Sequence, residues 1–218
     1  MRSMKWWLGG VALSMSLVAS GLTLAAGSGY NELKQPRPAN SSKKVEVIEF
    51  FGYGCPHCFT FDPALQNWVK KQGDNISFKR VPVMFHKPWA FHQKLFYTME
   101  ALGKSEEWHD KVFQAINVER QPLNSEEAIV AFAAKQGVDK KKFLDSWSGF
   151  SVDPKIKRAN QMQEEYQANE SPYVVIDGRY AVSITSAAQM VGEDKPEAQL
   201  QQTMLKVMDD LVVKSRKK

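Results

Sequence analysis

The sequence contains two cysteines, and both lie in one tetrapeptide, Cys55-Pro56-His57-Cys58. This tetrapeptide directly follows the apolar and β-branched residues 45–51 and precedes a stretch with helical apolar spacing. A disulfide between these cysteines closes a very short loop, whereas loop entropy assigns about 3 kcal/mol of stabilisation to a loop of 15 residues. The pair therefore predicts a strand that runs into a helix through a redox site, where the two sulfurs cycle between dithiol and disulfide.

Residues 1–26 are typical of a secretory signal peptide, with Arg2 and Lys5 in a basic start, an apolar stretch over residues 6–24 and small residues at the expected cleavage point. Glycines and serines dilute the apolar stretch, so a permanent membrane anchor is the weaker interpretation. No cysteine lies near the cleavage region, so we expect no lipid-attached form. We expect an exported protein in an oxidising compartment, where a disulfide can persist or cycle.

The remaining chain is long enough for one domain, or one domain with an insertion, at about 190 residues. Loss of the leader lowers the number of basic residues from 29 to 27 against 24 acidic residues, so the net charge falls from +5 to +3. This small excess does not predict nucleic-acid binding. The basic residues 214–218 are interpreted as the solvated end of a helix rather than a membrane-surface patch.

The apolar pattern divides the chain into strands on both sides of a helical block. Residues 27–44 are rich in glycine, proline, asparagine and serine and predict an extended arm, so regular structure is expected to begin at Val45. Two strands are predicted first, and helical spacing follows Pro88 for about 80 residues. A hairpin around Asp177-Gly178 and a last amphipathic helix close the chain. The predicted strands are residues 45–51, 76–83, 173–176 and 180–183, and the predicted helices after the first are residues 89–102, 106–117, 125–136, 140–147, 154–167 and 197–214.

Two details concern where the helices begin and bend. Asn124 with Glu127 three residues later resembles a capping box. Pro63 within the helix after the cysteines is expected to bend it, because proline removes a donor and crowds the preceding turn. The alternative is that the first helix ends before Asp62 and another helix starts.

The tetrapeptide predicts which cysteine reacts. A thiol attacks as the thiolate, and a free cysteine with a pKa of about 8.5 is mostly protonated at neutral pH. At the start of a helix, Cys55 would face unpaired N–H groups and the positive end of the helix dipole, and His57 can donate to its sulfur. A stabilised thiolate makes the disulfide form a ready electron acceptor. We therefore assign Cys55 as the exposed nucleophile and Cys58, one helical turn inward, as the resolving cysteine.

A metal site and a purely structural disulfide are the alternatives for the cysteine pair. A structural zinc site normally needs four ligands, and the sequence has no second Cys-x-x-Cys and no zinc-like histidine spacing. We therefore expect neither a metal nor a cofactor. Apart from His57, the histidines are interpreted as ordinary surface or helix residues; they are His86, His92 and His109.

Glu49 is a carboxylate inside an apolar strand, where it is costly unless it is paired or solvated. Lys79 on the next predicted strand is its expected partner. The alternative is a strand register that places either residue at a solvated edge.

The dipeptide Ser171-Pro172 stands at the entrance to the third predicted strand. A proline in this position can be a simple strand-edge residue. Because cis peptides occur at only about 5–6 per cent of X-Pro bonds, the residue pattern alone does not predict a cis bond between Ser171 and Pro172.

Together, these segments resemble the DsbA family of bacterial periplasmic thiol:disulfide interchange proteins. Residues 47–58, residues 171–180 and the helical block carry the resemblance, which covers nearly all of the chain after the leader, and Cys-Pro-His-Cys is the active-site tetrapeptide of the family. The resemblance implies an α/β, thioredoxin-like fold with an inserted helical domain. In this division, residues 45–87 and 169–218 form the thioredoxin-like domain and residues 88–168 form the insertion.

The resemblance also implies an activity and its partners. The family donates disulfides to unfolded exported proteins with cysteine pairs in the periplasm, and the membrane partner DsbB reoxidises it and passes the electrons to quinone. We expect a monomer that binds no nucleic acid. A periplasmic disulfide reductase or isomerase is the first alternative, although an isomerase would be expected to carry a dimerisation domain, and none fits before Val45. A chaperone-like binding module is the second alternative.

By position, the resemblance assigns roles to individual residues. Cys55 is the nucleophile, Cys58 the resolving cysteine and His57 the stabiliser of the thiolate. Pro172 is the cis-proline that faces the disulfide and beside which the substrate backbone binds.

Two further residues follow from the same comparison. Glu49 is the acid beneath the active site that helps to move the proton of the resolving thiol, with a smaller role for Lys79. Ser171 departs from the family, which often has valine or threonine before the cis-proline, and its hydroxyl is expected to contact the thiolate or to alter substrate exchange.

Overall fold

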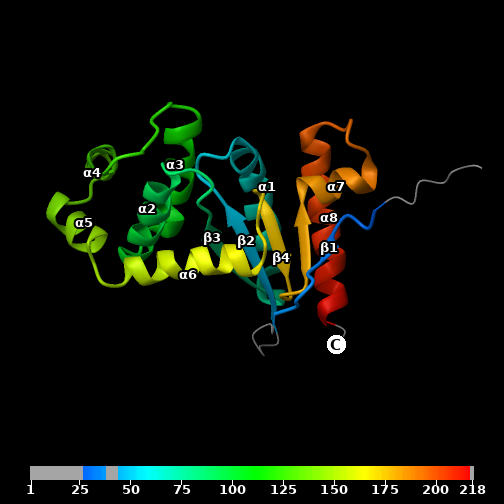
Figure 1. The fold of residues 1–218 in the computed structure, drawn as a ribbon. Helices are drawn as coiled ribbons and strands as arrows, with labels where there is room; N and C mark the ends of the chain where they lie inside the picture. The colour runs from blue at the N-terminus through cyan, green and yellow to red at the C-terminus, as the bar shows by residue number, and fades with distance from the viewer. Residues whose placement is uncertain (1–26, 38–43, 217–218) are drawn as a thin grey trace, which may run out of the picture.

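The structure is a computed structural model that describes residues 27–37 and 44–216. The predicted signal peptide and residues 38–43 of the predicted arm lie outside the described residues. In the described part, one mixed sheet with the strand order β1-β5-β4-β2-β3 forms the centre of the molecule (Figure 1). The strands are β1 Asn31–Glu32, β2 Val45–Phe51, β3 Ile76–Pro82, β4 Tyr173–Ile176 and β5 Tyr180–Ser183.

The pairing of the strands follows from their burial. β2 is buried along almost its whole length, as expected for an apolar run between two neighbouring strands. It pairs in parallel with β3 and antiparallel with β4, and β4 and β5 form the predicted hairpin. Helix α1 Pro56–Gln72 and the short 3-10 helix η1 Gly73–Asn75 connect the two parallel strands, because such a connection needs a crossover.

Five helices between β3 and β4 form the predicted insertion, on one side of the sheet in Figure 1. They are α2 Trp89–Ala101, α3 Ser105–Asn117, α4 Glu126–Lys135, α5 Lys140–Trp147 and α6 Val152–Glu165. On the other side lie α7 Ile184–Val191 and α8 Glu197–Arg216. None of the helices in the described part is both long and apolar enough to span a membrane.

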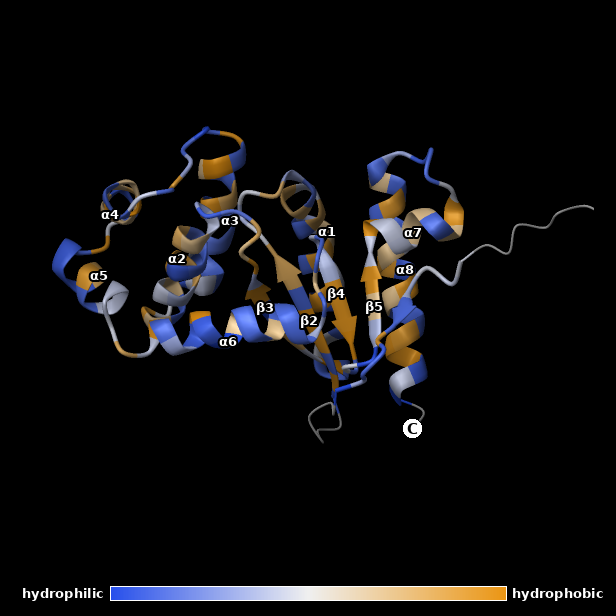
Figure 2. Cartoon of the chain, in the orientation of Figure 1, coloured by the Kyte–Doolittle hydropathy of each residue, from blue (hydrophilic) through white to orange (hydrophobic). Residues whose placement is uncertain are grey.

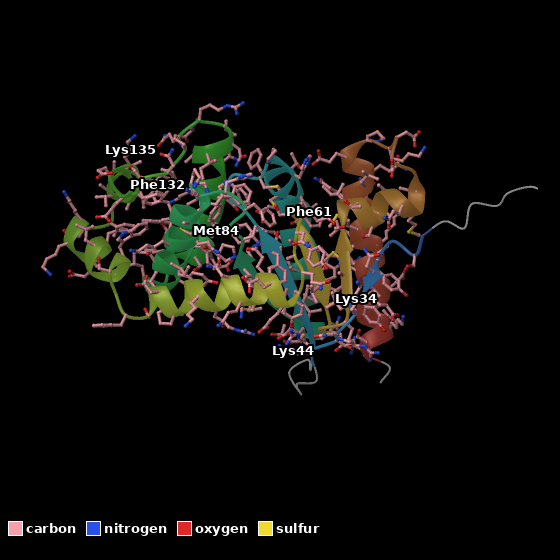
Figure 3. All side chains as sticks on the ribbon, viewed as in Figure 1. Lys34, Lys44, Phe61, Met84, Phe132 and Lys135 are labelled. Atoms are coloured by element: carbon pink, nitrogen blue, oxygen red, sulfur yellow. The ribbon has the colours of Figure 1, made fainter. Side chains whose placement is uncertain are left out.

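The core has two parts, one on each side of β2. Phe61 on α1 belongs to the part that α1, α8 and one face of the sheet enclose, and Phe132 on α4 belongs to the part shared with the inserted helices (Figure 3). In Figure 2, β4 and β5 are mainly hydrophobic, whereas the visible side of α6 is mainly hydrophilic. The burial of both faces of β2 holds its carboxyl end, and therefore the start of α1, in place.

Several predicted details of the fold are wrong. Regular structure begins before Val45, because the arm forms β1 and pairs with the edge strand β5, and α7 was not predicted. The residue that caps α4 is Ser125, whose side chain accepts from the Ala128 amide, and not Asn124. Helix α1 continues through Pro63 without ending, so the alternative of two separate helices is wrong.

Candidate active site

Cys55 lies at the carboxyl end of β2, where the chain leaves the sheet and enters α1. It is the N-cap residue of α1, and its sulfur accepts a hydrogen bond from the Cys58 amide at 3.4 Å. Pro56 follows in the first turn, where its missing N–H costs no helical hydrogen bond. Both sulfurs are free thiols in this structure. Cys55 is only 6% exposed, less than expected, but it is still the more accessible of the two because Cys58 is fully buried.

The surroundings of Cys55 favour its thiolate. A side-chain hydrogen bond from Cys58 is the largest cause, and together with a side-chain hydrogen bond from Ser171 and the amides of Cys58 and His57 it outweighs burial and lowers the pKa of Cys55 to about 6. These donors come from the first turn of α1 and from the loop before β4. They stabilise the Cys55 thiolate, as was expected of the helix start.

The surroundings of Cys58 have the opposite effect. Burial, the Cys55 sulfur and the negative charge of Glu49 raise the pKa of Cys58 well above its usual range. At neutral pH one sulfur is therefore mostly ionised and the other stays protonated, although both side chains are chemically identical.

The loop before β4 lies against the Cys55 sulfur. The peptide bond between Ser171 and Pro172 is cis, and the Cys55 thiol donates to the Ser171 carbonyl at 3.3 Å. The carbonyl favours the protonated thiol, whereas the Ser171 hydroxyl favours the thiolate. Ser171 thus offers the sulfur a carbonyl that accepts from the thiol and a side chain that lowers its pKa.

The His57 imidazole is turned toward α8. Its Nδ1 lies 2.9 Å from Glu197 Oε2, and about half of the side chain is exposed. Among the hydrogen bonds that lower the pKa of Cys55, His57 contributes its backbone amide. Sequence reasoning missed Glu197, because no local pattern connects it to a residue so far back in the chain.

The predicted pairing of Glu49 with Lys79 is wrong. The parallel register places Glu49 opposite Arg80, and the Arg80 Nε lies 3.0 Å from Glu49 Oε2. Because side chains alternate along a strand, Lys79 points to the other face of the sheet, where its Nζ contacts Met162 Sδ at 3.7 Å. The sequence pattern could have identified Arg80 rather than Lys79 as the partner of Glu49 only if the strand register had been known.

Glu49 is a buried acid whose charge interacts with those of Cys55 and Cys58. It is 1% exposed, and burial raises its pKa to about 7, with Arg80 opposing the shift and the charges of Asp62 and Cys55 adding to it. The Arg80 Nη2 also donates to Asp62 of α1 at 2.9 Å. The carboxyl of Glu49 can therefore gain or lose a proton near neutral pH below the active-site helix.

A second buried network connects the insertion to the active-site helix. His109 on α3 contacts Asp62 through Nε2 at 3.1 Å and Tyr53 through Nδ1 at 2.9 Å. His92 and His109 lie within helices, as the sequence predicted, but neither is at the surface, since each is 4% exposed, whereas His86 is exposed. His92 is bonded to the Pro122 carbonyl at 2.9 Å.

Trp89 packs against the loop that precedes Cys55. A Cβ atom on Gly54 would lie 2.7 Å from the indole Nε1, and one on Gly52 would lie closer still to the ring. Both positions therefore require glycine for the indole to approach the backbone. Sequence reasoning missed this role of Trp89, which stands at the first position of α2.

The described residues show no cluster of three or more histidine, cysteine, aspartate or glutamate side chains able to hold a metal ion. The arrangement at Cys55 is that of a dithiol site with one stabilised thiolate, a buried second thiol and a titratable acid beneath them.

Comparisons with known proteins agree with this geometry. The DSBA-like thioredoxin domain matches residues 46–203. The thiol:disulfide interchange protein DsbA of Burkholderia cepacia is 43% identical over 183 residues, which are 81% of this chain and 86% of that protein. The DsbA of Bordetella parapertussis is 36% identical over 211 residues, 96% of each chain. The crystal structure of Pseudomonas aeruginosa DsbA is similar with a TM-score of 0.76 and 34% identity, over 86% of this chain and 92% of that one.

Proposed function

The chain belongs to the DSBA-like thioredoxin domain family and is a disulfide-forming thiol:disulfide oxidoreductase, and we propose that it donates a Cys55–Cys58 disulfide to exported proteins that carry cysteine pairs. The family match and the solved structures confirm the predicted α/β, thioredoxin-like fold with a helical insertion. The boundaries at residues 45–87, 88–168 and 169–218 stay predictions.

The observation that carries the proposal is the difference between the two thiols. The pKa of Cys55 is lowered to about 6 and that of Cys58 is raised. A client thiolate attacks the Cys55 sulfur, the Cys55–Cys58 bond breaks, and Cys58 leaves and takes up a proton. A second client thiolate then attacks the client sulfur of the mixed disulfide and releases Cys55 as a thiolate. The client is oxidised by two electrons, and the stability of the Cys55 thiolate favours this direction.

Glu49 is the proposed source of the proton that Cys58 takes up. Its pKa of about 7 means that the protonated and ionised forms are both present near neutral pH, and its charge acts on Cys58. Arg80 rather than Lys79 is the cation next to this acid, so Lys79 is left out of the proposed proton path.

Client binding is proposed at the loop before β4. Pro172 and Ser171 lie beside Cys55, so an extended client backbone bound there would bring its sulfur close to the nucleophile. His57, half exposed at the same place, is proposed to stabilise the thiolate when the charge develops.

The proposed setting follows from the resemblance and the leader. The protein acts in the periplasm as a monomer, and the membrane quinone reductase DsbB reoxidises it after each client. Purified DsbB-containing membranes with quinone are expected to restore the Cys55–Cys58 disulfide, which thiol counting on the reduced protein measures.

The decisive experiment is turnover of a reduced client with cysteine variants. Wild-type protein is expected to oxidise the client, Cys55→Ala to lose turnover, and Cys58→Ala to accumulate mixed disulfides with the client. A binding module would instead keep client binding in Cys55→Ser and show no turnover. Equilibration in glutathione buffers separates an oxidase from a reductase, because a reductase would have a potential well below that of glutathione.

A further inference from the structure

A carboxylate network joins the first turn of α1 to the first turn of α8. Glu197 Oε2 is the partner of His57 Nδ1 at 2.9 Å. Its other oxygen, Oε1, accepts from the Thr60 hydroxyl at 2.8 Å and from Gln201 Nε2 at 2.7 Å. Gln201 also donates to Thr60 Oγ1 at 2.8 Å. The carboxylate is therefore held in one position by three donors from two helices.

Glu197 and the Cys55 thiolate are two anions that can both interact with the His57 ring. The start of α1 is positive and faces the Cys55 sulfur, and by the proposed function the His57 ring stabilises the same thiolate when it is protonated. Glu197 is an anion bound to that same imidazole, so its charge offsets the field that the imidazolium would direct at the sulfur.

We propose that Glu197 is a positioning residue that holds the His57 ring through Nδ1 and moderates the oxidising strength of the Cys55–Cys58 pair. The inference rests on the proposed roles of Cys55 and His57 and adds a residue that adjusts them. Without this carboxylate, the positive charge of the His57 imidazolium would stabilise the Cys55 thiolate more strongly. The disulfide form would then accept electrons more readily.

The hydrogen bonds at Glu197 favour its ionised form. Partial burial disfavours its ionised form, but the hydrogen bonds from Thr60, His57 and Gln201 outweigh this and lower the pKa of Glu197 below its usual value. The carboxylate also lies in the first turn of α8, where a negative charge is favoured by the helix dipole.

The test is the variant Glu197→Gln in glutathione buffers. In this equilibrium, oxidised protein and two glutathione molecules give reduced protein and glutathione disulfide. We expect the equilibrium constant of Glu197→Gln to rise about two- to fivefold over wild type, as for the loss of one exposed ion pair, and the thiolate absorbance of the reduced variant to appear at lower pH. Glu193→Gln removes an exposed carboxylate from the loop before α8 and is expected to leave the equilibrium unchanged.

A second comparison shows whether Glu197 acts through His57. In a His57→Ala background, the additional change Glu197→Gln is expected to have almost no effect. The proposal is overturned if Glu197→Gln leaves the equilibrium unchanged or shifts it toward oxidised protein, or if the shift persists without His57. If wild-type protein does not exchange electrons with glutathione, the proposed function fails instead.

Discussion

Cys55 owes its reactivity to donors that surround one sulfur and miss the other. Both cysteines are buried, but Cys55 faces amides and side-chain donors, whereas Cys58 faces Cys55 and the charge of Glu49. The sulfur with the lowered pKa is therefore also the more accessible of the two, as the proposed mechanism requires of the sulfur that clients attack. The two side-chain donors, Cys58 and Ser171, can each be removed by substitution.

Cys58 itself is the largest of these donors. We expect the thiolate absorbance of the reduced wild-type protein to rise with a midpoint near pH 6, which makes Cys55 about nine-tenths ionised at pH 7. Cys58→Ala removes the side-chain hydrogen bond and should raise the midpoint by about one pH unit. Cys58→Ser keeps a hydroxyl donor and should fall between the two. A midpoint that is the same in Cys58→Ala and Cys58→Ser would show that the hydrogen bond is not the cause.

The hydroxyl of Ser171 is the next side-chain donor to the Cys55 sulfur. Ser171→Val removes the hydroxyl and keeps the Ser171 carbonyl, so the pKa of Cys55 should rise and the protein should become a weaker oxidant, by about fivefold in its equilibrium with glutathione. Ser171→Thr keeps the hydroxyl and should stay close to wild type. Equal values for the valine and threonine variants would contradict this role.

The helix α1 and the strands beneath it form one electrostatic unit. Glu49 on β2 and Arg80 on β3 share the face of the sheet that α1 covers, and Asp62 on α1 completes the group. His109 extends it to the insertion. Within this group, the protonation of Glu49 is coupled to the protonation of Cys58.

Helix α2 contributes to the site through the indole of Trp89, which packs against the loop before Cys55. Gly52→Ala should lower the free energy of unfolding by about 1–3 kcal/mol, because the new methyl group overlaps the ring. In a Trp89→Ala background the same change should cost much less, since the overlap is gone. Denaturant unfolding of the four proteins measures the coupling, and additive costs would rule out the contact as the reason for the glycine.

The stability of the whole protein should depend on pH through Glu49. Its pKa is raised from 4.5 to about 7, so the folded state keeps a proton that the unfolded state releases between these values. The contribution to stability is complete below pH 4.5 and is lost as the pH rises through 7, by an amount on the order of 3 kcal/mol.

Glu49→Gln should remove this loss. The free energy of unfolding of the oxidised protein, in which neither cysteine titrates, should then change less between pH 4.5 and 8 in the variant than in wild type. Glu193→Gln, an exposed carboxylate, serves as the control and should keep the wild-type profile. Parallel profiles for wild type and Glu49→Gln would contradict the raised pKa.

Elements with a clear local pattern were predictable. The buried strand β2, the hairpin of β4 and β5, and the inserted helices have apolar repeats of the expected period, and their ends lie within a few residues of the prediction. The strand β1 has only two residues and exists because β5 offers an edge, so no repeat within the arm could show it. The cap of α4 was misplaced by one residue, because two neighbouring side chains both suit that position.

The placement of the cysteine pair at a helix start followed from residues close together in the chain, where unpaired N–H groups can stabilise a thiolate. The partners of that site did not. Arg80 rather than Lys79, His109 and Glu197 reach the active-site helix from other elements, and which of several similar side chains arrives depends on strand register and helix packing. Local sequence therefore determines that Cys55 is reactive, and only the folded chain determines which charges adjust it, because those charges act through distances that exist after folding.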